Sequence, residues 1–136
     1  MPNFYLMFGG NCQEALKTYE EAFDAKIAAI QKYSDMPPNP NFRVSEEQRN
    51  LVLHSSINIL GSDFMCADSN SGCSAGSNMY VSVSADEAAV RKAWDILKQD
   101  GKVYMELQPA FFAKLHGSLQ DRFGINWMFS VGIQDA

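Results

Sequence analysis

The chain has 136 residues, of which 46% are hydrophobic and 20% charged, and a net charge of −5 at pH 7. This length and composition predict one globular domain that needs no disulfide or metal to stay folded, and they exclude global disorder. The eleven Lys and Arg residues form no cluster, which disfavours nucleic acid and anionic membranes as partners. No apolar run reaches the roughly 18 residues of a transmembrane helix, and no signal peptide is visible.

The three cysteines, Cys12, Cys66 and Cys73, do not suggest a disulfide framework. Their number is odd, their spacing is wide and no export signal accompanies them, so we expect reduced thiols and a cytoplasmic location. Strand alternation predicts that Cys66 points into the core. Cys12 falls in the first turn of a predicted helix, where it is either a partly buried thiol or a stabilised thiolate.

The first half of the chain predicts the order strand, helix, strand, strand, strand. The helix begins at Asn11, which we expect to form a capping box with Glu14, and it ends near Asp24. Its apolar stripe is expected at Ala15, Leu16, Tyr19, Ala22 and Phe23. Strands are expected at residues 3–8, 26–33, 51–60 and 63–68. The segment from Ser34 to Asn50 contains three prolines in four positions and is either a solvated connector or a lid or dimer arm.

The second half predicts the same order after a linker rich in Ser and Gly at residues 69–78. Asp86 caps a helix that Gly101 stops, and the apolar stripe of this helix is expected at Val90, Ala93, Trp94 and Leu97. Strands are expected at residues 79–84, 102–108 and 126–133, with a short one at 119–122. Residues 109–118 are expected to be irregular.

The two halves of the sequence match each other. Residues 3–8 match residues 78–83 at an offset of 75, and the helix caps Asn11 and Asp86 match at the same offset. Residues 61–65 match residues 124–128 near the end of each half. Two copies are too few for a solenoid, so the match predicts two βαβββ modules, residues 1–70 and 71–136, within a single domain of residues 1–136. Chance matching of short apolar runs is the alternative.

Five short motifs are distributed over nearly the whole chain. They are FGGNCQEAL at residues 8–16, SDMPP at 34–38, VLH at 52–54, DGKV at 100–103 and DRFGINW at 121–127. Together with the duplication, they resemble the PhnB-like branch of the vicinal oxygen chelate superfamily, which includes glyoxalase I, fosfomycin-resistance proteins, bleomycin-binding proteins and extradiol dioxygenases. The resemblance implies an α+β fold in which the two modules form a curved mixed-sheet cup with helices outside, and the cup holds the ligand.

Many members of this superfamily bind a divalent metal in the cup through the first and last strands of each module. The resemblance maps the four ligand positions to Asn3, Met65, Asn78 and Met128. Thioethers and neutral amides are poor ligands for Mg²⁺, Mn²⁺, Ni²⁺ or Zn²⁺. We therefore expect no metal at the usual site and no cofactor.

Strand alternation predicts which side chains line the cup instead. Seven residues are expected to contact a ligand, and they combine soft apolar walls with a few polar anchors: His54, Ser56, Met65, Tyr80, Glu106, Phe112 and Met128. His54 is either a general base or orienting donor, or a histidine satisfied by Ser or Tyr neighbours within the sheet. Glu106 is either a base with a raised pKa or an exposed carboxylate at the rim.

These features favour a protein that binds a small molecule in the cup without metal and forms a homodimer. The alternative is a metal-dependent enzyme of the glyoxalase or dioxygenase type, acting as a lyase, isomerase or dioxygenase. Some PhnB-like proteins carry a methyltransferase label. The sequence does not support that activity here, because Gly9-Gly10 does not belong to a G-x-G-x-x-G loop of the kind that binds S-adenosylmethionine.

Overall fold

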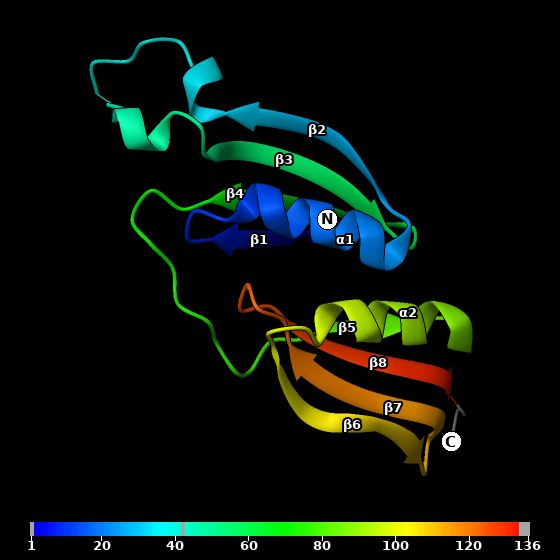
Figure 1. The fold of residues 1–136 in the computed structure, drawn as a ribbon. Helices are drawn as coiled ribbons and strands as arrows, with labels where there is room; N and C mark the ends of the chain where they lie inside the picture. Colours follow the sequence, from blue (N-terminus) through cyan, green and yellow to red (C-terminus); the bar gives the residue numbers. More distant parts are fainter. Residues whose placement is uncertain (1, 42, 134–136) are drawn as a thin grey trace. The chain divides into compact units, whose positions relative to one another are not determined.

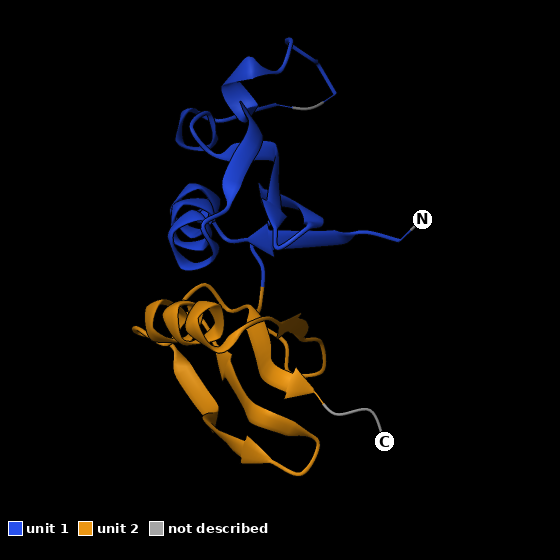
Figure 2. Ribbon diagram, turned by 90° about the vertical axis from the view of Figure 1, so that its right-hand side faces the viewer, with its two compact units in different colours: residues 1–73 blue, residues 74–136 orange. Residues whose placement is uncertain are grey.

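Two four-stranded mixed sheets, each with one α-helix packed on one face, make up the part of the chain that the structure describes, residues 2–41 and 43–133. The structure is a computed structural model. Its contacts divide the chain into two units, unit 1 (Met1–Cys73) and unit 2 (Ser74–Ala136) (Figure 2). The predicted α+β class of two βαβββ modules is confirmed. Among the described residues, no helix is both long and apolar enough to span a membrane.

Unit 1 contains β1 (Phe4–Phe8), α1 (Cys12–Phe23), β2 (Lys26–Lys32), β3 (Val52–Ile59) and β4 (Ser62–Asp68) (Figure 1). Its strands lie in the order β1-β4-β3-β2, with β1 parallel to β4 and the other neighbours antiparallel. The apolar stripe predicted for the helix is buried against the sheet, at Ala15, Leu16, Tyr19, Ala22 and Phe23. Leu60 and Gly61, with φ angles of 49° and 91°, form the two-residue turn between β3 and β4.

The predicted capping box of α1 is wrong. Asn11 holds the N-cap position but its side chain makes no capping hydrogen bond. The Asp68 carboxylate, at the end of β4, accepts hydrogen bonds from the backbone N–H groups of Gly10 and Cys12 at 3.0 and 2.9 Å. A residue 56 positions away along the chain from Cys12 therefore satisfies the free donors at the start of this helix.

The connection between β2 and β3 contains two short 3₁₀ helices, Tyr33–Asp35 and Glu46–Gln48. Tyr33 is buried, and its hydroxyl donates to the backbone oxygen of Asp68 at 3.0 Å. Residue 42 of this segment lies outside the described residues. The start of the connection is thus anchored to the core, while its interpretation as connector, lid or dimer arm stays a prediction.

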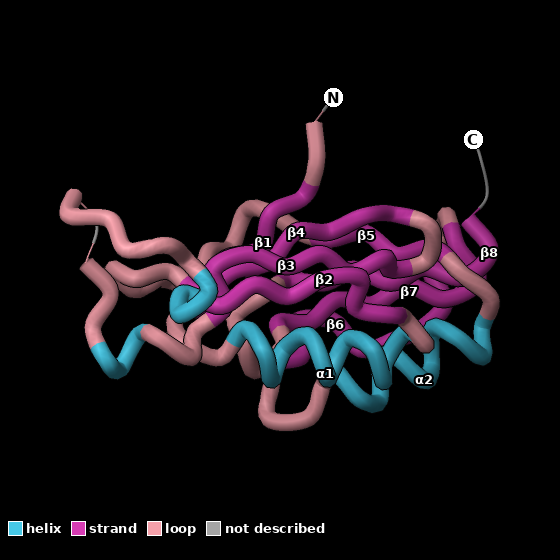
Figure 3. Tube along the Cα trace, turned by 90° about the horizontal axis from the view of Figure 1, so that it is seen from above, coloured by secondary structure: helices cyan, strands magenta, loops and turns pink. Residues whose placement is uncertain are grey.

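Unit 2 contains β5 (Val81–Ser84), α2 (Glu87–Leu97), β6 (Lys102–Ala110), β7 (Ala113–Gln120) and β8 (Asn126–Ile133). The strand order β5-β8-β7-β6 repeats that of unit 1, and β5 is parallel to β8. Each helix lies on one side of its own sheet (Figure 3). The predicted stripe of α2 is buried, at Val90, Ala93, Trp94 and Leu97. The helix ends at Leu97, and Gly101 lies in the turn that follows.

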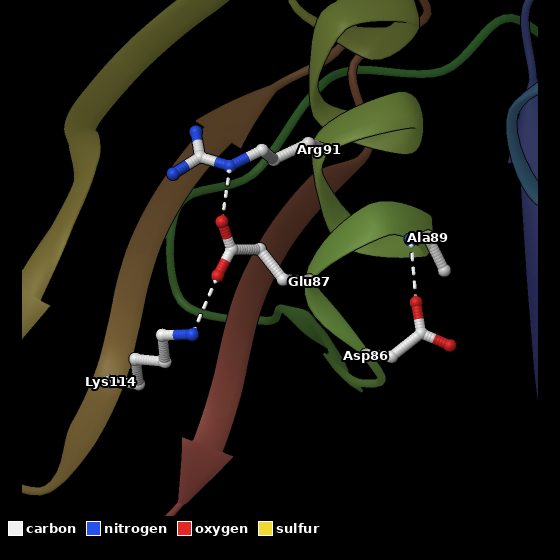
Figure 4. Close-up of polar contacts among 5 residues, drawn as sticks. All are labelled: Asp86, Glu87, Ala89, Arg91 and Lys114. Atoms are coloured by element: carbon white, nitrogen blue, oxygen red, sulfur yellow. Dashed lines mark hydrogen bonds and ion pairs between the residues drawn. The ribbon is translucent and has the colours of Figure 1, made fainter.

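The first turn of α2 is held by its own side chains and by β7 (Figure 4). As predicted, Asp86 caps the helix, since its carboxylate accepts from the Ala89 N–H at 2.8 Å. The Glu87 carboxylate accepts from Arg91 on the next turn and forms an ion pair with Lys114 of β7, both at 2.9 Å. This exposed ion-pair network links the helix to the sheet of unit 2.

The prediction that residues 109–118 are irregular is wrong, because β6 and β7 cover most of them as a long hairpin. Pro109 is tolerated because β6 is an edge strand, where a missing N–H breaks no pairing on the outer side. Gly117 allows close strand approach, because a Cβ there would lie 2.9 Å from the Leu107 Cα. The short strand expected at residues 119–122 is the end of β7 followed by the hairpin turn.

Candidate functional site

The face of the unit 1 sheet opposite α1, here called open face 1, carries Tyr5 and three of the predicted ligand contacts. Tyr5 of β1 lies opposite Met65 of β4, and Met65 lies opposite Ser56 of β3. Paired residues on neighbouring strands point to the same face, so these three form one row across the sheet. His54 precedes Ser56 by two positions and shares its face. The structure therefore places His54, Ser56 and Met65 on one face of this sheet, and their contact with a ligand stays a prediction.

A hydrogen bond between Tyr5 and His54 is the main polar feature of open face 1. The Tyr5 hydroxyl lies 3.1 Å from His54 Nδ1, and the two rings are tilted with centroids 5.8 Å apart. Burial, followed by the nearby Cys66 and Cys12 thiols, raises the pKa of the Tyr5 hydroxyl above its usual value, so Tyr5 is neutral at pH 7. The hydroxyl is the donor when the imidazole carries its proton on Nε2.

Apolar side chains surround this hydrogen bond and remain in part exposed. Tyr5 and Met7 have exposed fractions of 45% and 44%. Met65, which lies opposite Tyr5 on one side and Ser56 on the other, is half-buried. An exposed apolar patch around a polar pair is typical of a surface that binds a ligand or another protein.

The corresponding face of unit 2, here called open face 2, repeats the row with different residues. Met128 of β8 lies opposite Ser82 of β5 on one side and Ser118 of β7 on the other. Met128 is half-buried, as is Met65 in the equivalent place of unit 1. The predicted ligand contact Met128 thus lies on the face opposite the helix.

Tyr80 lies beside a polar cluster centred on Asn126. The Tyr104 hydroxyl donates to Asn126 Oδ1 at 3.1 Å, and the Tyr80 and Tyr104 rings meet edge to face at 6.2 Å. The Asn126 amide donates to the backbone oxygens of Gly76 and Met79. Asn126 therefore fixes both the Tyr104 ring and the segment that leads into β5.

Glu106 is not brought close to the other predicted site residues of unit 2 by the strand register. It lies on the edge strand β6 and is exposed. Register shifts on both sides of Met105 break the regular alternation of side chains along β6. Met105 lies opposite Ser118 and so faces the same way as Met128.

His116 is a candidate residue that the sequence reasoning missed. Its Nδ1 lies 2.9 Å from the Ser130 hydroxyl on β8, and its ring meets the Phe112 ring edge to face at 4.8 Å. The predicted ligand contact Phe112 thus packs beside His116. Because residues 109–118 were expected to be irregular, no face was assigned to this histidine.

A repeated motif in the sequence would have revealed it. LHSSI at residues 53–57 matches LHGSL at residues 115–119, with His54 and His116 at the same place. The register supports the match, because Ser56 opposes Met65 as Ser118 opposes Met128. His54 and His116 are therefore equivalent positions of the two units.

The register also corrects the alignment of the first strands. Phe4 lies opposite Phe64, and Val81 lies opposite Trp127. Since residues 61–65 match 124–128, β1 and β5 are equivalent at an offset of 77, and the expected offset of 75 is wrong for this strand. The unit 2 equivalent of Asn3 is therefore Tyr80 and not the predicted Asn78. The loop before α1 is accordingly longer than the loop before α2.

The donor chemistry at the metal positions of the fold does not fit a hard divalent cation. Met65 faces Tyr5 on the first strand of unit 1, and Met128 faces Ser82 on that of unit 2. Thioethers are weak ligands for such ions. No group of three or more His, Cys, Asp or Glu side chains suited to a metal lies within the described residues.

A surface hollow of about 400 Å³ lies elsewhere in unit 2, between the turn after α2 and the β7–β8 hairpin. It is lined by both acids and bases, among them Lys102, Asp121 and Arg122, and by none of the predicted site residues. Asp121 is committed to the hairpin, because its carboxylate accepts from the N–H groups of Phe123 and Ile125 and from Trp127 Nε1. We therefore interpret this hollow as a consequence of the hairpin turn and not as a ligand site.

A family model described as 3-demethylubiquinone-9 3-methyltransferase matches residues 3–130. The chain belongs to this family. Protein YjdN of Escherichia coli K12 is 28% identical over 135 residues, covering 93% of this chain and 92% of YjdN. The PhnB protein from Bacillus cereus is 28% identical with a TM-score of 0.74, covering 96% of this chain and 98% of that one. The predicted PhnB-like branch is thereby confirmed.

Two further solved structures share the fold of this chain. Protein PA1353 from Pseudomonas aeruginosa has a TM-score of 0.85 at 25% identity, with 99% of this chain and 98% of that chain covered. FosX from Listeria monocytogenes, a vicinal oxygen chelate protein solved with Mn(II) and sulfate, has a TM-score of 0.65 at 8% identity, covering 97% and 89%. The likeness to FosX concerns the fold alone and confirms the predicted superfamily fold.

The methyl donor suggested by the family description does not fit the strand-to-helix turns seen here. Nucleotide cofactors are held by free N–H groups at a helix start that follows a glycine-rich loop. After Gly9-Gly10, the N–H groups of Gly10 and Cys12 already donate to the buried Asp68 carboxylate. In unit 2, Asp86 occupies the start of α2 in the same way.

Proposed function

We propose that this member of the family binds a small, partly apolar molecule on open face 1, without metal, and that His54 anchors it. The observation that carries the proposal is the 3.1 Å hydrogen bond between the Tyr5 hydroxyl and His54 Nδ1 within an exposed apolar patch. When the neutral Tyr5 hydroxyl donates to Nδ1, the imidazole carries its proton on Nε2. That N–H makes no hydrogen bond to any described residue and is available to an oxygen of the ligand.

The surroundings of His54 suit an apolar ligand body. Met7 and Met65 are flexible, polarizable side chains that adapt to ligands of different shape. Ser56 adds one neutral hydroxyl on the same face. A few polar anchors among apolar walls are the usual composition of a small-molecule site.

The chemistry of the nearby thiols supports binding rather than thiol catalysis. Burial raises the pKa of the Cys66 thiol to about 12 and also raises that of Cys12. Both thiols are fully buried and remain protonated at neutral pH. The alternative of a reactive thiolate at Cys12 is therefore not part of the proposal.

The test is calorimetric titration of the protein with small apolar acids, namely benzoate, phenylacetate and hexanoate. Tyr5→Phe removes the hydroxyl that orients His54, and we expect an affinity loss of roughly fivefold, the value of one hydrogen bond of about 1 kcal/mol. His54→Gln should abolish measurable binding. Lys17→Gln, on the exposed side of α1, is the matched control and should bind as the parent does. Equal affinity in all four proteins would disprove the role of His54.

The metal-dependent alternative, a lyase, isomerase or dioxygenase, is tested on the same preparation. Elemental analysis should find less than one equivalent of any transition metal, and Mn²⁺, Ni²⁺ or Zn²⁺ should leave the melting temperature unchanged. A stoichiometric metal, or a melting shift that saturates with metal, would overturn the metal-free proposal.

We also propose a homodimer located in the cytoplasm. The four-stranded sheets have β1 and β2, and β5 and β6, as their edge strands, and Phe111 in the β6–β7 turn is fully exposed, so both features favour association with a second copy. The three unpaired cysteines suit a reducing compartment. Sedimentation velocity at several concentrations tests the dimer, and a monomer throughout would disprove it.

A further inference from the structure

We infer that unit 2 carries a second ligand-anchoring site, centred on His116, that takes a small organic carboxylate. The inference extends the proposed function, because His116 is the equivalent of His54 in the repeated LHxS motif. Its geometry is nevertheless independent of unit 1. It rests on the contacts of His116, Ser130 and Phe112 within unit 2.

Ser130 holds the His116 ring in one orientation. Ser130 has an exposed fraction of 3%, and its hydroxyl lies 2.9 Å from His116 Nδ1. When the hydroxyl donates to Nδ1, the imidazole proton lies on Nε2. No described residue hydrogen-bonds His116 Nε2, so this N–H is available to a bound molecule.

The row of side chains around His116 is polar and uncharged. His116 pairs with Ser130 on one side and with Gln108 on the other, and Ser130 pairs with Ser84. Four hydrogen-bonding side chains without a carboxylate thus cross open face 2 in one line. Such a row matches a ligand that brings its own negative charge and accepts several hydrogen bonds, as a carboxylate does.

Phe112 supplies the apolar wall of this site. Its ring packs edge to face on His116 with centroids 4.8 Å apart, and 44% of the side chain is exposed. A ligand with an aromatic or aliphatic body next to its carboxylate would cover this ring. The polar row and Phe112 together select a carboxylate joined to a compact apolar group.

The comparison with unit 1 gives the strongest support. In both units the same imidazole atom, Nδ1, is engaged by a hydroxyl, but the hydroxyl comes from Tyr5 of β1 in unit 1 and from Ser130 of β8 in unit 2. Ala67 stands at the unit 1 position equivalent to Ser130. The two units engage Nδ1 through different hydroxyl partners, and both arrangements leave Nε2 available. This indicates that Nε2 is the atom that binds the ligand.

The chain contains two histidines, so NMR of the imidazole nitrogens gives one set of signals per unit. We would titrate the full-length, ¹⁵N-labelled protein with benzoate and, as the uncharged control, with benzyl alcohol. His54→Gln and His116→Gln serve to assign the two sets. Benzoate should shift both sets saturably, with dissociation constants on the order of 1–10 mM, and benzyl alcohol should shift neither His116 signal.

The outcomes separate the inference from the proposed function. A shift of the His54 signals alone would overturn the second site and leave the proposed function intact. A shift of the His116 signals alone would support the second site and overturn the anchoring role of His54. No shift in either set would overturn both, and an equal response of His116 to benzyl alcohol would overturn the carboxylate specificity. Ser130→Ala should weaken the His116 response at least fivefold and leave the His54 response unchanged.

Discussion

The two units share a strand order and a helix position, yet each is pinned by a different buried aspartate. In unit 1, the Asp68 carboxylate at the end of β4 accepts hydrogen bonds from Gly10, Cys12 and Val52. In unit 2, the Asp121 carboxylate after β7 accepts from Phe123, Ile125 and Trp127. The duplicated pattern of apolar residues thus fixes the topology of both units. The hydrogen bonds accepted by Asp68 and by Asp121, here called the two clamps, differ between the units.

Neither clamp has a counterpart in the other unit. The match between the halves places Val131 at the position of Asp68 and Ile59 at the position of Asp121. In unit 1, Asp68 accepts hydrogen bonds at the start of the helix α1. In unit 2, Asp86 caps α2, and Asp121 stabilises the β7–β8 hairpin turn instead. The difference predicts that the two units respond to different mutations.

The largest expected effect is that of Asp68→Ala on unit 1. The substitution removes the charged acceptor of three backbone N–H groups, two of them in buried hydrogen bonds, and we expect a loss of roughly 3–5 kcal/mol in the free energy of unfolding. Both tryptophans, Trp94 and Trp127, lie in unit 2. Urea unfolding followed by circular dichroism should therefore shift more than the same curve followed by tryptophan fluorescence.

Asp63→Ala is the control for this change, because Asp63 lies on the same strand but its hydrogen bond with Asn58 is exposed. Its cost should stay within about 0.5 kcal/mol. A similar cost for the two variants would contradict the clamp role of Asp68. Coincident curves by both probes would show that the units unfold together.

A somewhat smaller effect is expected for Asp121→Ala in unit 2. The hairpin turn loses two backbone hydrogen bonds and the indole of Trp127 loses its acceptor, for a loss of about 2–4 kcal/mol. Here the fluorescence curve should shift at least as much as the circular dichroism curve. Asp95→Ala, on the exposed side of α2, is the matched control. An unchanged fluorescence midpoint would disprove the role of Asp121.

Ser130→Ala tests the difference between the two histidines. The variant gives unit 2 the residue that unit 1 has at Ala67, and it removes the hydrogen bond to His116 Nδ1. Because His116 is only half-buried and one neutral hydrogen bond is lost, we expect a loss of about 1 kcal/mol in stability. The imidazole NMR signals of His116 should then show both tautomers, while those of His54 stay unchanged. A single tautomer of His116 in the variant would contradict this account.

The smallest expected effect concerns Glu87. The equivalent position of unit 1 is occupied by the apolar Cys12. Hydrogen bonds from Lys114 and Arg91 lower the pKa of the Glu87 carboxyl below its usual value. A lowered pKa adds stability above the unfolded pKa, and this stability is lost as the pH falls through the folded pKa. Glu87→Gln should slightly lower the melting temperature at pH 7 in low salt, and high salt or acid should abolish the difference. A decrease that persists in high salt would contradict an electrostatic origin.

Several features of the fold followed from local sequence patterns. The helical stripe of α2, its cap Asp86 and the strand from Asn126 to Ile133 were all predicted with their observed places. These signals are local, because helix periodicity, caps and strand alternation depend on residues a few positions apart. Of the candidate site, the same alternation assigned His54, Ser56 and Met65 to one face.

Other features depended on contacts between distant residues. Asp68, which caps the helix α1, lies 56 positions after Cys12 in the chain. The bulges of β6 arise from its pairing with β7. No local sequence pattern predicts either feature. The link between Tyr5 and His54 spans 49 positions and requires the register of β1, β4 and β3. The sequence by itself determined the periodic elements and the duplicated class of fold. The tertiary structure decided strand register, the buried clamps and the partner of each histidine, because these depend on cross-strand hydrogen bonds and burial that form only when the sheets assemble.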